Sequence, residues 1–488
     1  MISFVLSLAA LVIGYFFYGR FVEKVFGPDD RPTPAVEKAD GVDFIVLPGW
    51  KIFMIQFLNI AGTGPIFGAI MGAKFGPSCY LWIVFGCIFA GAMHDYMSGM
   101  LSMRNGGSGL PGLIGKYLGN ATKKLMLVFT VLLLIMVGTV FVYSPAAILG
   151  SIGGSATMWI FVIFIYYVIA TMLPIDKVIG KVYPLFAISL LFMALALMIV
   201  LFIKMPHLPE LWDGLGNMAV KADASWTDNI FPCLFITVAC GAISGFHATQ
   251  SPLMARCVKS ERMGRPIFYG SMITEGVVAL IWATVSMYFF YGDPTPGYQL
   301  LAAAKETGFN TSAPEVVNII CNDWLGVVGG VLALLGVVAA PITSGDTAFR
   351  SARLIIAENI NVEQKSILKR FCISIPLFVT SILFLLWQIN NPNGFNVIWQ
   401  YFGWANQALS VFTLWALTVY LVRENKLYII TLMPALFMTT VCATFLFISK
   451  QAFHLDAPVA YGLGVLVFVI AVVWFVLWYG NYKKSLIK

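Results

Sequence analysis

Charged residues are scarce in this chain. Only 11% of its 488 residues are Asp, Glu, Lys or Arg, while 59% are hydrophobic and the mean hydropathy is +0.86. Soluble globular proteins carry about 25% charged residues. So few charges do not cover the water-facing surface of a chain this long, which excludes an ordinary soluble enzyme, a disordered regulator and a secreted disulfide scaffold. The composition predicts a polytopic membrane protein.

Sequence patterns for metals, disulfides and nucleic acids are also lacking. The eight cysteines form no CxxC pair, and the four histidines show no metal-ligand spacing. The formal charge of +7 comes from basic residues spread over short loops rather than from one basic patch. We therefore expect no metal, no cofactor and no nucleic-acid partner. The lipid bilayer and a small-molecule substrate, together with a proton or sodium ion, are the expected partners, and the oligomeric state stays open.

Long apolar stretches dominate the sequence. A transmembrane helix needs about 20 mainly apolar residues. The first stretch lacks a basic n-region and a small-residue cleavage site, so we expect a retained helix rather than a signal peptide. The sequence predicts an all-α protein with about thirteen transmembrane helices, at residues 2–18, 50–73, 79–103, 125–147, 156–173, 183–204, 229–250, 266–291, 325–348, 371–388, 396–421, 427–449 and 459–480.

The basic residues predict the orientation of these spans. When loop 19–49 is placed in the cytoplasm and the chain alternates, 25 Lys and Arg residues fall on the cytoplasmic side. The other side keeps five, namely Lys74, Lys204, Lys221, Lys305 and Lys450. This asymmetry follows the positive-inside rule. It predicts an N-terminus outside and a C-terminus in the cytoplasm.

Two of the predicted helices are interrupted by glycine-rich segments. Span 50–73 contains Ala61-Gly62-Thr63-Gly64-Pro65, and span 229–250 contains Gly241-Ala242-Ile243-Ser244-Gly245-Phe246-His247. Each break lies about 12 residues after entry, roughly 18 Å along the helix axis. The two helices enter from opposite sides, so both breaks reach the middle of the bilayer. Close packing at glycine is the simpler explanation of one such break, but the matched pair favours a substrate site on discontinuous helices.

The breaks also predict a division of the chain into inverted repeats. Residues 50–204 form a first set of five helices, and residues 229–421 form a second set of opposite orientation. Residues 1–49 add an extra helix with a cytoplasmic linker, and residues 427–488 add two helices and a basic tail.

Three acidic residues fall inside predicted spans, where burial of a charge is costly and so indicates function. Glu275 lies roughly 14 Å into its helix, and it is either a proton carrier or a hydrogen-bond acceptor that never titrates. Asp346 precedes Arg350 by one turn, so a structural ion pair is the alternative to a site beside Thr343 and Ser344. Asp95 lies near the cytoplasmic end of its span, and we expect a gate or loop anchor there.

Other polar residues lie close to the breaks. His247 could titrate near physiological pH or be a satisfied core histidine. Freed backbone amides attract an anion and freed carbonyls attract a cation. Thr343 and Ser344 are therefore a possible sodium site or gate, unless their hydroxyls bond back to their own helix. The predicted substrate-binding residues are Gln56, Asn59, Gly62, Thr63, Gly64, Ser244, Gly245, Phe246, His247, Asn406 and Gln407.

Several longer strings resemble one known family. They are AGTGPIFGAIMGAKFG (61–76), GFHATQSPLMARC (245–257), EGVVALIWA (275–283), PITSGDTAFRSARLIIA (341–357) and YFGWANQ (401–407). Over residues 25–420 they are similar to carbon starvation protein A, the CstA family of peptide and pyruvate transporters. The resemblance implies a secondary transporter of the amino acid–polyamine–organocation superfamily in a bacterial or archaeal cytoplasmic membrane, with a LeuT-like 5+5 inverted-repeat core.

The sequence also departs from that family. Its long members carry further C-terminal helices, and they tend to carry a His pair where this chain has Gln56-Phe57-Leu58-Asn59. The choice between peptide and pyruvate, and between proton and sodium, therefore stays open.

The predicted function is uptake of short peptides or pyruvate in the starvation response. The protein would be a non-enzymatic, proton-coupled symporter in which Glu275 and His247 carry the proton. A sodium-coupled carboxylate or amino-acid transporter and a nutrient-binding membrane sensor are the alternatives. A channel would need a continuous polar pore, and a membrane-embedded enzyme would need a cluster of catalytic groups; the sequence favours neither.

Overall fold

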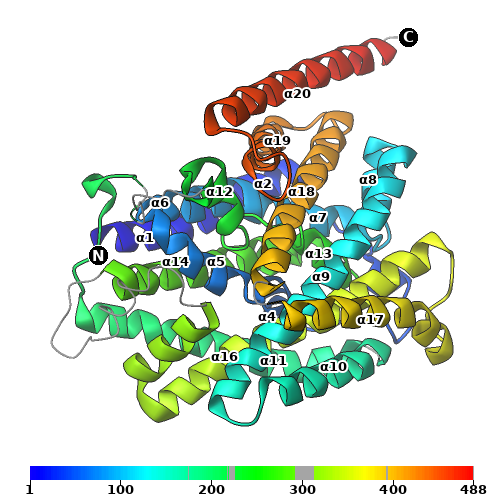
Figure 1. The fold of residues 1–488 in the computed structure, drawn as a ribbon. Helices are drawn as coiled ribbons and strands as arrows, with labels where there is room; N and C mark the ends of the chain where they lie inside the picture. Colours follow the sequence, from blue (N-terminus) through cyan, green and yellow to red (C-terminus); the bar gives the residue numbers. More distant parts are fainter. Residues whose placement is uncertain (174, 217, 219–225, 292–312, 392–393, 487–488) are drawn as a thin grey trace.

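The computed structural model describes residues 1–488 except 174, 217, 219–225, 292–312, 392–393 and 487–488. Among the residues described, every regular element is helical, as the sequence predicts (Figure 1). The all-helical architecture is the one expected of a chain whose apolar residues lie in a lipid bilayer. In lipid, a helix satisfies its backbone hydrogen bonds within a single segment.

The helices differ widely in length. The main ones are α1 (Ile2–Phe16), α2 (Tyr18–Phe26), α4 (Gly49–Ala61), α5 (Gly64–Gly72), α7 (Ala92–Arg104), α8 (Leu110–Leu118), α9 (Asn120–Ile152), α10 (Ala156–Met172), α11 (Ile175–Lys204), α12 (Ile230–Thr237), α13 (His247–Ala255), α14 (Gly270–Tyr291), α16 (Ala313–Asn359), α17 (Ile367–Asn390), α18 (Gly394–Arg423), α19 (Ile429–Ile448) and α20 (Ala457–Ser485). Short helical pieces join some of them, including α3 (Pro34–Glu37), α6 (Ser78–Leu81) and the π-helical η2 (Trp82–Gly91).

Within the part of the chain that the structure describes, ten helical segments are long and apolar enough to cross a membrane. The bent pair α4 and α5 makes an eleventh when it is counted as one span, and α10 is apolar but has only 17 residues. Each of the thirteen predicted ranges holds at least one helix. The second interrupted range holds only the short helices α12 and α13. The count of thirteen crossings therefore stays a prediction.

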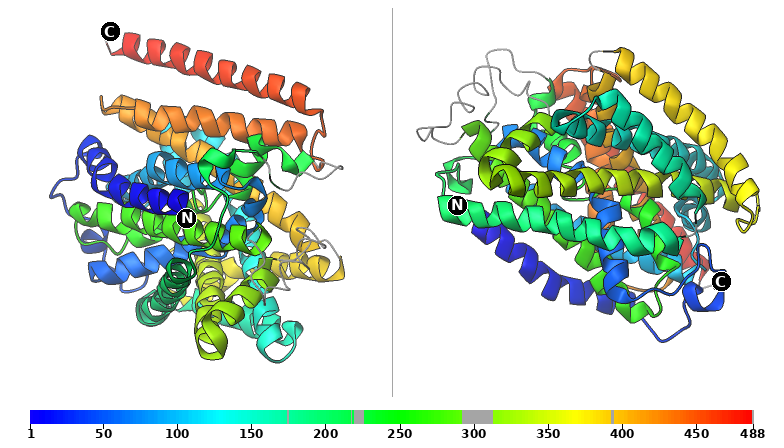
Figure 2. Two further views of the ribbon diagram at one scale, coloured as in Figure 1. Left: turned by 90° about the vertical axis from the view of Figure 1, so that its left-hand side faces the viewer. Right: turned by 90° about the horizontal axis from the view of Figure 1, so that it is seen from below.

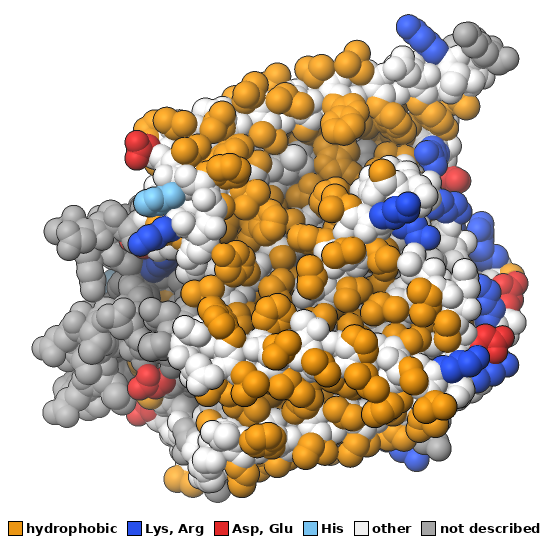
Figure 3. All heavy atoms as spheres, turned by 45° about the vertical axis from the view of Figure 1, so that its right-hand side comes forward, with side chains coloured by type: hydrophobic (Ala, Val, Ile, Leu, Met, Phe, Trp, Pro, Cys, Tyr) orange, Lys and Arg blue, Asp and Glu red, His pale blue; other side chains and the backbone are white. Residues whose placement is uncertain are grey.

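On the face that Figure 3 shows, hydrophobic side chains form a broad band between two ends that carry charged side chains. We call one of these the basic end. There Arg104 pairs with Glu261, Arg256 with Glu358, and Lys426 bonds the carbonyl of Phe26. The opposite end holds Met1, Lys74, Lys204 and Lys450, whereas Lys221 and Lys305 lie outside the described residues. The termini lie at the two different ends (Figures 1 and 2).

The interrupted helices lie inside the bundle and the C-terminal helix lies outside it. Helix α16 packs against α9, α11 and α4, and α14 packs against both α4 and α5. Helix α20 packs along α19 and leaves most of its surface exposed (Figure 2). Helices α14 and α16 therefore pack against the first interrupted helix, and α19 packs against α12.

Candidate substrate and ion site

The first break lies between α4 and α5. Gly62 has a φ of +48°, a conformation that a side chain disfavours, and the two helices meet at a bend of 42°. Pro65 then occupies the first turn of α5, where its missing N–H costs nothing. No side chain in the described part of the chain caps the first amides of α5. This N-terminus can therefore accept an anionic group.

The second break is longer and is held in place by α18. Asn406 Oδ1 accepts hydrogen bonds from Ser244 Oγ at 3.0 Å and from the Phe246 amide at 2.6 Å. The Gly245 amide donates to the Asn406 carbonyl, and Gln407 Nε2 donates to the Ile243 carbonyl at 2.9 Å. These contacts satisfy a non-helical backbone that would otherwise be costly to bury.

The sequence predicts that freed amides at 61–64 and 244–247 meet a substrate carboxylate. In the second segment, the amides of Gly245, Phe246 and His247 donate within the protein, and Asn406 and Gln407 position this break. In the first segment, the amides of Ile66 and Phe67 donate to the Thr63 carbonyl and Pro65 has no N–H. Within the described chain, Gly64 is therefore the first-turn residue of α5 whose amide is open to an anion.

The two breaks touch each other. A Cβ added to Gly64 would lie 2.2 Å from Cys240 Sγ, and one added to Gly68 would lie 2.8 Å from the Thr237 carbonyl oxygen. Side chains at these glycines would therefore separate the helices. The glycine-rich sequence of the first break is explained by this close approach. No local pattern in the sequence identifies Cys240 as the partner.

A chain of buried ionisable side chains begins beside the second break. His94 Nδ1 and His247 Nδ1 each lie 2.8 Å from a carboxylate oxygen of Asp95. On its other side, His247 Nε2 lies 3.4 Å from Glu275 Oε2. All four side chains are fully buried. Helices α7, α13 and α14 are thus joined by one polar connection through an otherwise apolar core.

Two predicted residues have different surroundings from those expected. Asp95 contacts the second break rather than a loop, because α7 packs against α13. Glu275 has no basic residue one turn away in the sequence, yet the fold gives it His247 from a distant segment. His94 joins the same chain, although sequence analysis did not single it out.

Cys240, His247 and Glu275 also offer a thiol, an imidazole and a carboxylate whose ligand atoms lie within 4.8 Å of one another. These groups could surround one divalent cation. The spacing of these three residues along the sequence matches no metal-binding motif, so only the fold shows that they lie together.

The predicted hydroxyl pair divides into two roles. Ser344 Oγ lies 3.0 Å from the carbonyl oxygens of both Leu58 and Asn59, at the end of α4. Thr343 Oγ1 donates instead to the carbonyls of Ala339 and Ala340 in its own helix. Back-bonding, the alternative considered from the sequence, therefore applies to Thr343, whereas Ser344 faces the first break.

Asp346 and Arg350 bond to different partners. Tyr183 donates to Asp346 Oδ2 at 2.6 Å, and Arg350 donates to the carbonyls of Ala170 and Leu173 at the end of α10. Among the ion pairs of the described residues, Arg350 is matched with Asp43 at 3.7 Å rather than with Asp346. The ion pair along α16, one of the two alternatives considered from the sequence, is thus replaced by contacts to other elements.

Several polar groups beside the first break are buried with partners still missing. Neither end of the Asn59 amide nor the Thr63 hydroxyl has a hydrogen-bond partner within the described chain. Gln56 Nε2 donates to Ser251 Oγ at 3.3 Å, while its oxygen stays unpartnered among these residues. Unpaired buried polar groups are costly and rare. Their concentration here marks a place where a polar ligand can bind.

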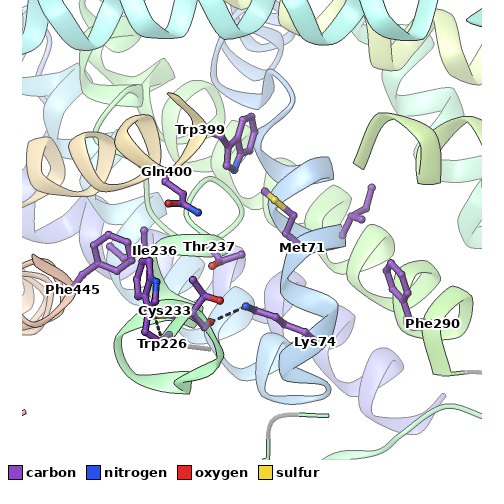
Figure 4. Close-up of a pocket in the computed structure, with 13 residues that line it drawn as sticks. Met71, Lys74, Trp226, Cys233, Ile236, Thr237, Phe290, Trp399, Gln400 and Phe445 are labelled. Carbon is purple, nitrogen blue, oxygen red and sulfur yellow. Dashed lines mark hydrogen bonds between the residues drawn. The ribbon is translucent and has the colours of Figure 1, made fainter. Parts of the chain in front are cut away.

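A pocket of about 220 Å³ lies next to the two breaks, between residues of α5 and α12 (Figure 4). Met71 of α5 and Thr237 of α12 lie on its walls together with Lys74, Trp226 and Trp399. Lys74 donates to the Thr227 carbonyl at 2.7 Å. None of the predicted substrate residues lines this pocket, but Thr237 directly precedes the second break.

The fold is that of a membrane transporter. A solved structure, the manganese transporter of Eremococcus coleocola, aligns with a TM-score of 0.55 at 10% identity. The alignment covers 91% of this chain and 99% of that one. At this identity the likeness concerns the fold alone.

The chain belongs to the carbon starvation protein CstA family, whose pattern matches residues 1–152, 145–293 and 302–445. The resemblance read from the sequence is thereby confirmed. The peptide transporter CstA of Escherichia coli K12 is 25% identical, over 94% of this chain and 82% of its own length. An uncharacterised membrane protein of Haemophilus influenzae is 45% identical over 59% of this chain and 91% of its own. The pyruvate/proton symporter BtsT of E. coli K12 is 27% identical, and the match covers 60% of this chain and 50% of that protein.

Proposed function

We propose that this transporter is a proton-coupled symporter that imports short peptides or pyruvate across the cytoplasmic membrane. The observation that carries the proposal is the buried contact series from Asp95 through His247 to Glu275. A carboxyl and an imidazole this close can exchange a proton, and both reside on elements that border the second break. One of the relatives is named as a pyruvate/proton symporter and another as a peptide transporter.

The substrate's carboxylate would bind at the first break. At the start of α5 the Gly64 amide is open, since Pro65 has no N–H and the Ile66 and Phe67 amides donate to the Thr63 carbonyl. The Asn59 amide and the Thr63 hydroxyl, which have no hydrogen-bond partner within the described chain, lie beside it. Pyruvate and a peptide both present a carboxylate, so this arrangement suits either substrate. Gln56 lies one turn earlier on α4 and would contact the remainder of the substrate.

The proposal includes a LeuT-like arrangement of two inverted repeats, 50–204 and 229–421. Interrupted helices at corresponding positions in the two repeats, in direct contact at Gly64 and Cys240, support it. Rocking of the two halves about this contact would expose the site to each side alternately. The basic end would face the cytoplasm, following the positive-inside rule, with the N-terminus outside.

Sodium coupling is the second candidate function. It is favoured by one observation, the position of Ser344 Oγ at 3.0 Å from two carbonyl oxygens of α4. Hydroxyl and carbonyl oxygens are ligands that hard cations prefer. A sodium ion there would link α16 to the first break, while the Asp95–His247–Glu275 series would then be structural.

Uptake by purified protein in liposomes separates the two candidates. Labelled pyruvate and a labelled dipeptide are offered under an imposed pH gradient or an imposed sodium gradient. We expect the pH gradient to drive accumulation. We also expect Glu275→Gln to abolish that accumulation while substrate exchange, which needs no net proton movement, continues.

Two controls make this result specific. Glu363→Gln removes an exposed carboxyl from the loop after α16 and should leave uptake unchanged. A chelator arm tests whether a cation bound at Cys240, His247 and Glu275 contributes. Accumulation that follows only the sodium gradient, survives Glu275→Gln and is lost in Ser344→Ala would overturn proton coupling.

A further inference from the structure

Three arginines are buried together at the basic end, where α16 and α17 meet the end of α10. Arg350 and Arg353 are fully buried and Arg370 is 6% exposed. The carbonyls of Ala170 and Leu173 accept from Arg350, and the Met172 carbonyl accepts from Arg370 at 2.6 Å. These two guanidinium groups therefore cap the last turn of α10, which favours cations.

Arg353 has no such structural role. Among the described residues, its guanidinium makes one hydrogen bond, from Nη2 to Asp43 Oδ1 at 3.5 Å, while its Nε and Nη1 atoms have no acceptor. Arg350 likewise directs Nε and Nη1 toward no hydrogen-bonding partner in the residues described. A buried guanidinium with unused donors is costly unless an anion approaches it.

Few acidic side chains lie near the buried arginines. Of the described acidic side chains, only Asp43 lies within 4.0 Å of Arg350 or Arg353, and it serves both. Asp43 is 2% exposed and sits in the loop that precedes α4. Asp40 Oδ1 accepts from the amides of Val42, Asp43 and Phe44, so the loop is held by its own turn. The loop that precedes α4 thus places the Asp43 carboxylate against Arg350 and Arg353; we call it the covering loop.

We propose that Arg350 and Arg353 form an oxyanion-binding site at the basic end, in which Asp43 occupies the position of an external carboxylate. Without Asp43, the Arg353 guanidinium can bind a carboxylate or a phosphate through paired hydrogen bonds that include Nη2. Arg350, whose Nη2 is bonded to the carbonyls of Ala170 and Leu173, adds a single donor. When the loop withdraws, the arginines bind the carboxylate of the substrate on its way out. The covering loop then reoccupies the site after release.

This inference rests on the proposed function only for the identity of the carboxylate. The site itself is testable without transport, by binding of inorganic phosphate to the purified full-length protein in a neutral detergent. Titration calorimetry at constant ionic strength would compare wild type, Asp43→Asn, and Asp43→Asn combined with Arg353→Gln.

We expect Asp43→Asn to tighten phosphate binding about tenfold, because the internal competitor is gone. Adding Arg353→Gln should return the affinity to the wild-type level or below it. Should the Gln variant not fold, Arg353→Lys keeps the charge but loses the fork, and it should weaken binding to an intermediate degree. Equal phosphate affinity in wild type and Asp43→Asn would overturn the site.

The source of the oxyanion is tested separately. Pyruvate should compete with phosphate in Asp43→Asn, and the competition should be the same in nanodiscs of phosphatidylcholine and of phosphatidylglycerol. If phosphate binds in phosphatidylcholine nanodiscs but not in phosphatidylglycerol nanodiscs, a lipid headgroup occupies the site. The proposed role of the site in substrate release is then wrong. If the wild-type protein binds phosphate as expected but shows no gradient-driven uptake in liposomes, the proposed function is wrong and the oxyanion site stands.

Discussion

The contact between the two helix breaks gives a sharp prediction. A methyl group placed on Gly64 would lie 2.2 Å from Cys240 Sγ and 2.4 Å from Cys240 Cβ, both far inside van der Waals contact. Because the nearest backbone atom, the Cys240 Cα, is 3.9 Å away, removal of the Cys240 side chain leaves room for that methyl. Gly64→Ala should therefore be damaging alone and rescued by Cys240→Gly.

The expected size follows from overpacking of a dense core. Gly64→Ala should lower the free energy of unfolding by about 1–3 kcal/mol. The double variant should recover at least about 1 kcal/mol relative to the sum of the single changes. Unfolding in a denaturing detergent, followed by tryptophan fluorescence, measures the stability. Pyruvate uptake measures whether transport is lost when the two breaks are forced apart.

The control is Gly462→Ala in α20, where an added methyl would meet nothing within 4 Å. It should leave both measurements unchanged. Additive effects of Gly64→Ala and Cys240→Gly, within about 0.5 kcal/mol, would refute the direct contact.

Three further predictions concern the surroundings of the site. Asn406→Ala should lower the free energy of unfolding by about 2–4 kcal/mol, since two buried donors of the second break lose their acceptor, as chemical unfolding would reveal. Ser344→Ala should impair uptake far more than Thr343→Ala, because only the former contacts α4; equal effects in the transport assay would be inconsistent with that division. Hydrogen bonds from Arg31 lower the pKa of Asp29 well below its usual value, so this pair should stabilise the fold at neutral pH and lose that effect as the pH falls below about 4. Comparing the unfolding midpoints of wild type and Asp29→Asn at neutral and acid pH tests the sign.

Local signals in the sequence account for much of the fold. The apolar stretches predict where helices form, because the bilayer length and backbone hydrogen bonding constrain each stretch separately. The first break was predictable for the same reason, since Gly62 and Pro65 act on their own helix. The second break begins a few residues before the expected segment, because α12 ends at Thr237.

The composition of the site was harder to predict. The contact of His247 with Asp95 joins residues 152 positions apart, and Ser244 and Asn406 are separated by 162 positions. Such pairs depend on how helices pack, which leaves no periodic signal in either segment. Nothing in the sequence distinguishes Cys240 from the other seven cysteines, although the fold places it at the meeting point of both breaks.

The charges at the end of α16 illustrate the same limit. One-turn spacing makes an ion pair between Asp346 and Arg350 one of two alternatives. In the structure Tyr183 donates to Asp346, and Arg350 donates to a carbonyl of α10. Helical spacing brings two residues to one face, but a neighbouring helix with a better donor or acceptor decides which bonds form.

Transport under a pH gradient alone decides whether a proton carried by Glu275 drives uptake. Labelled pyruvate and a labelled dipeptide would be offered to liposomes that contain wild type or Glu275→Gln, with only a pH gradient imposed. We expect wild type to accumulate one substrate or both, and the variant to exchange substrate without accumulating it. If Glu275→Gln accumulates substrate to the same level as wild type, Glu275 does not carry the coupling proton.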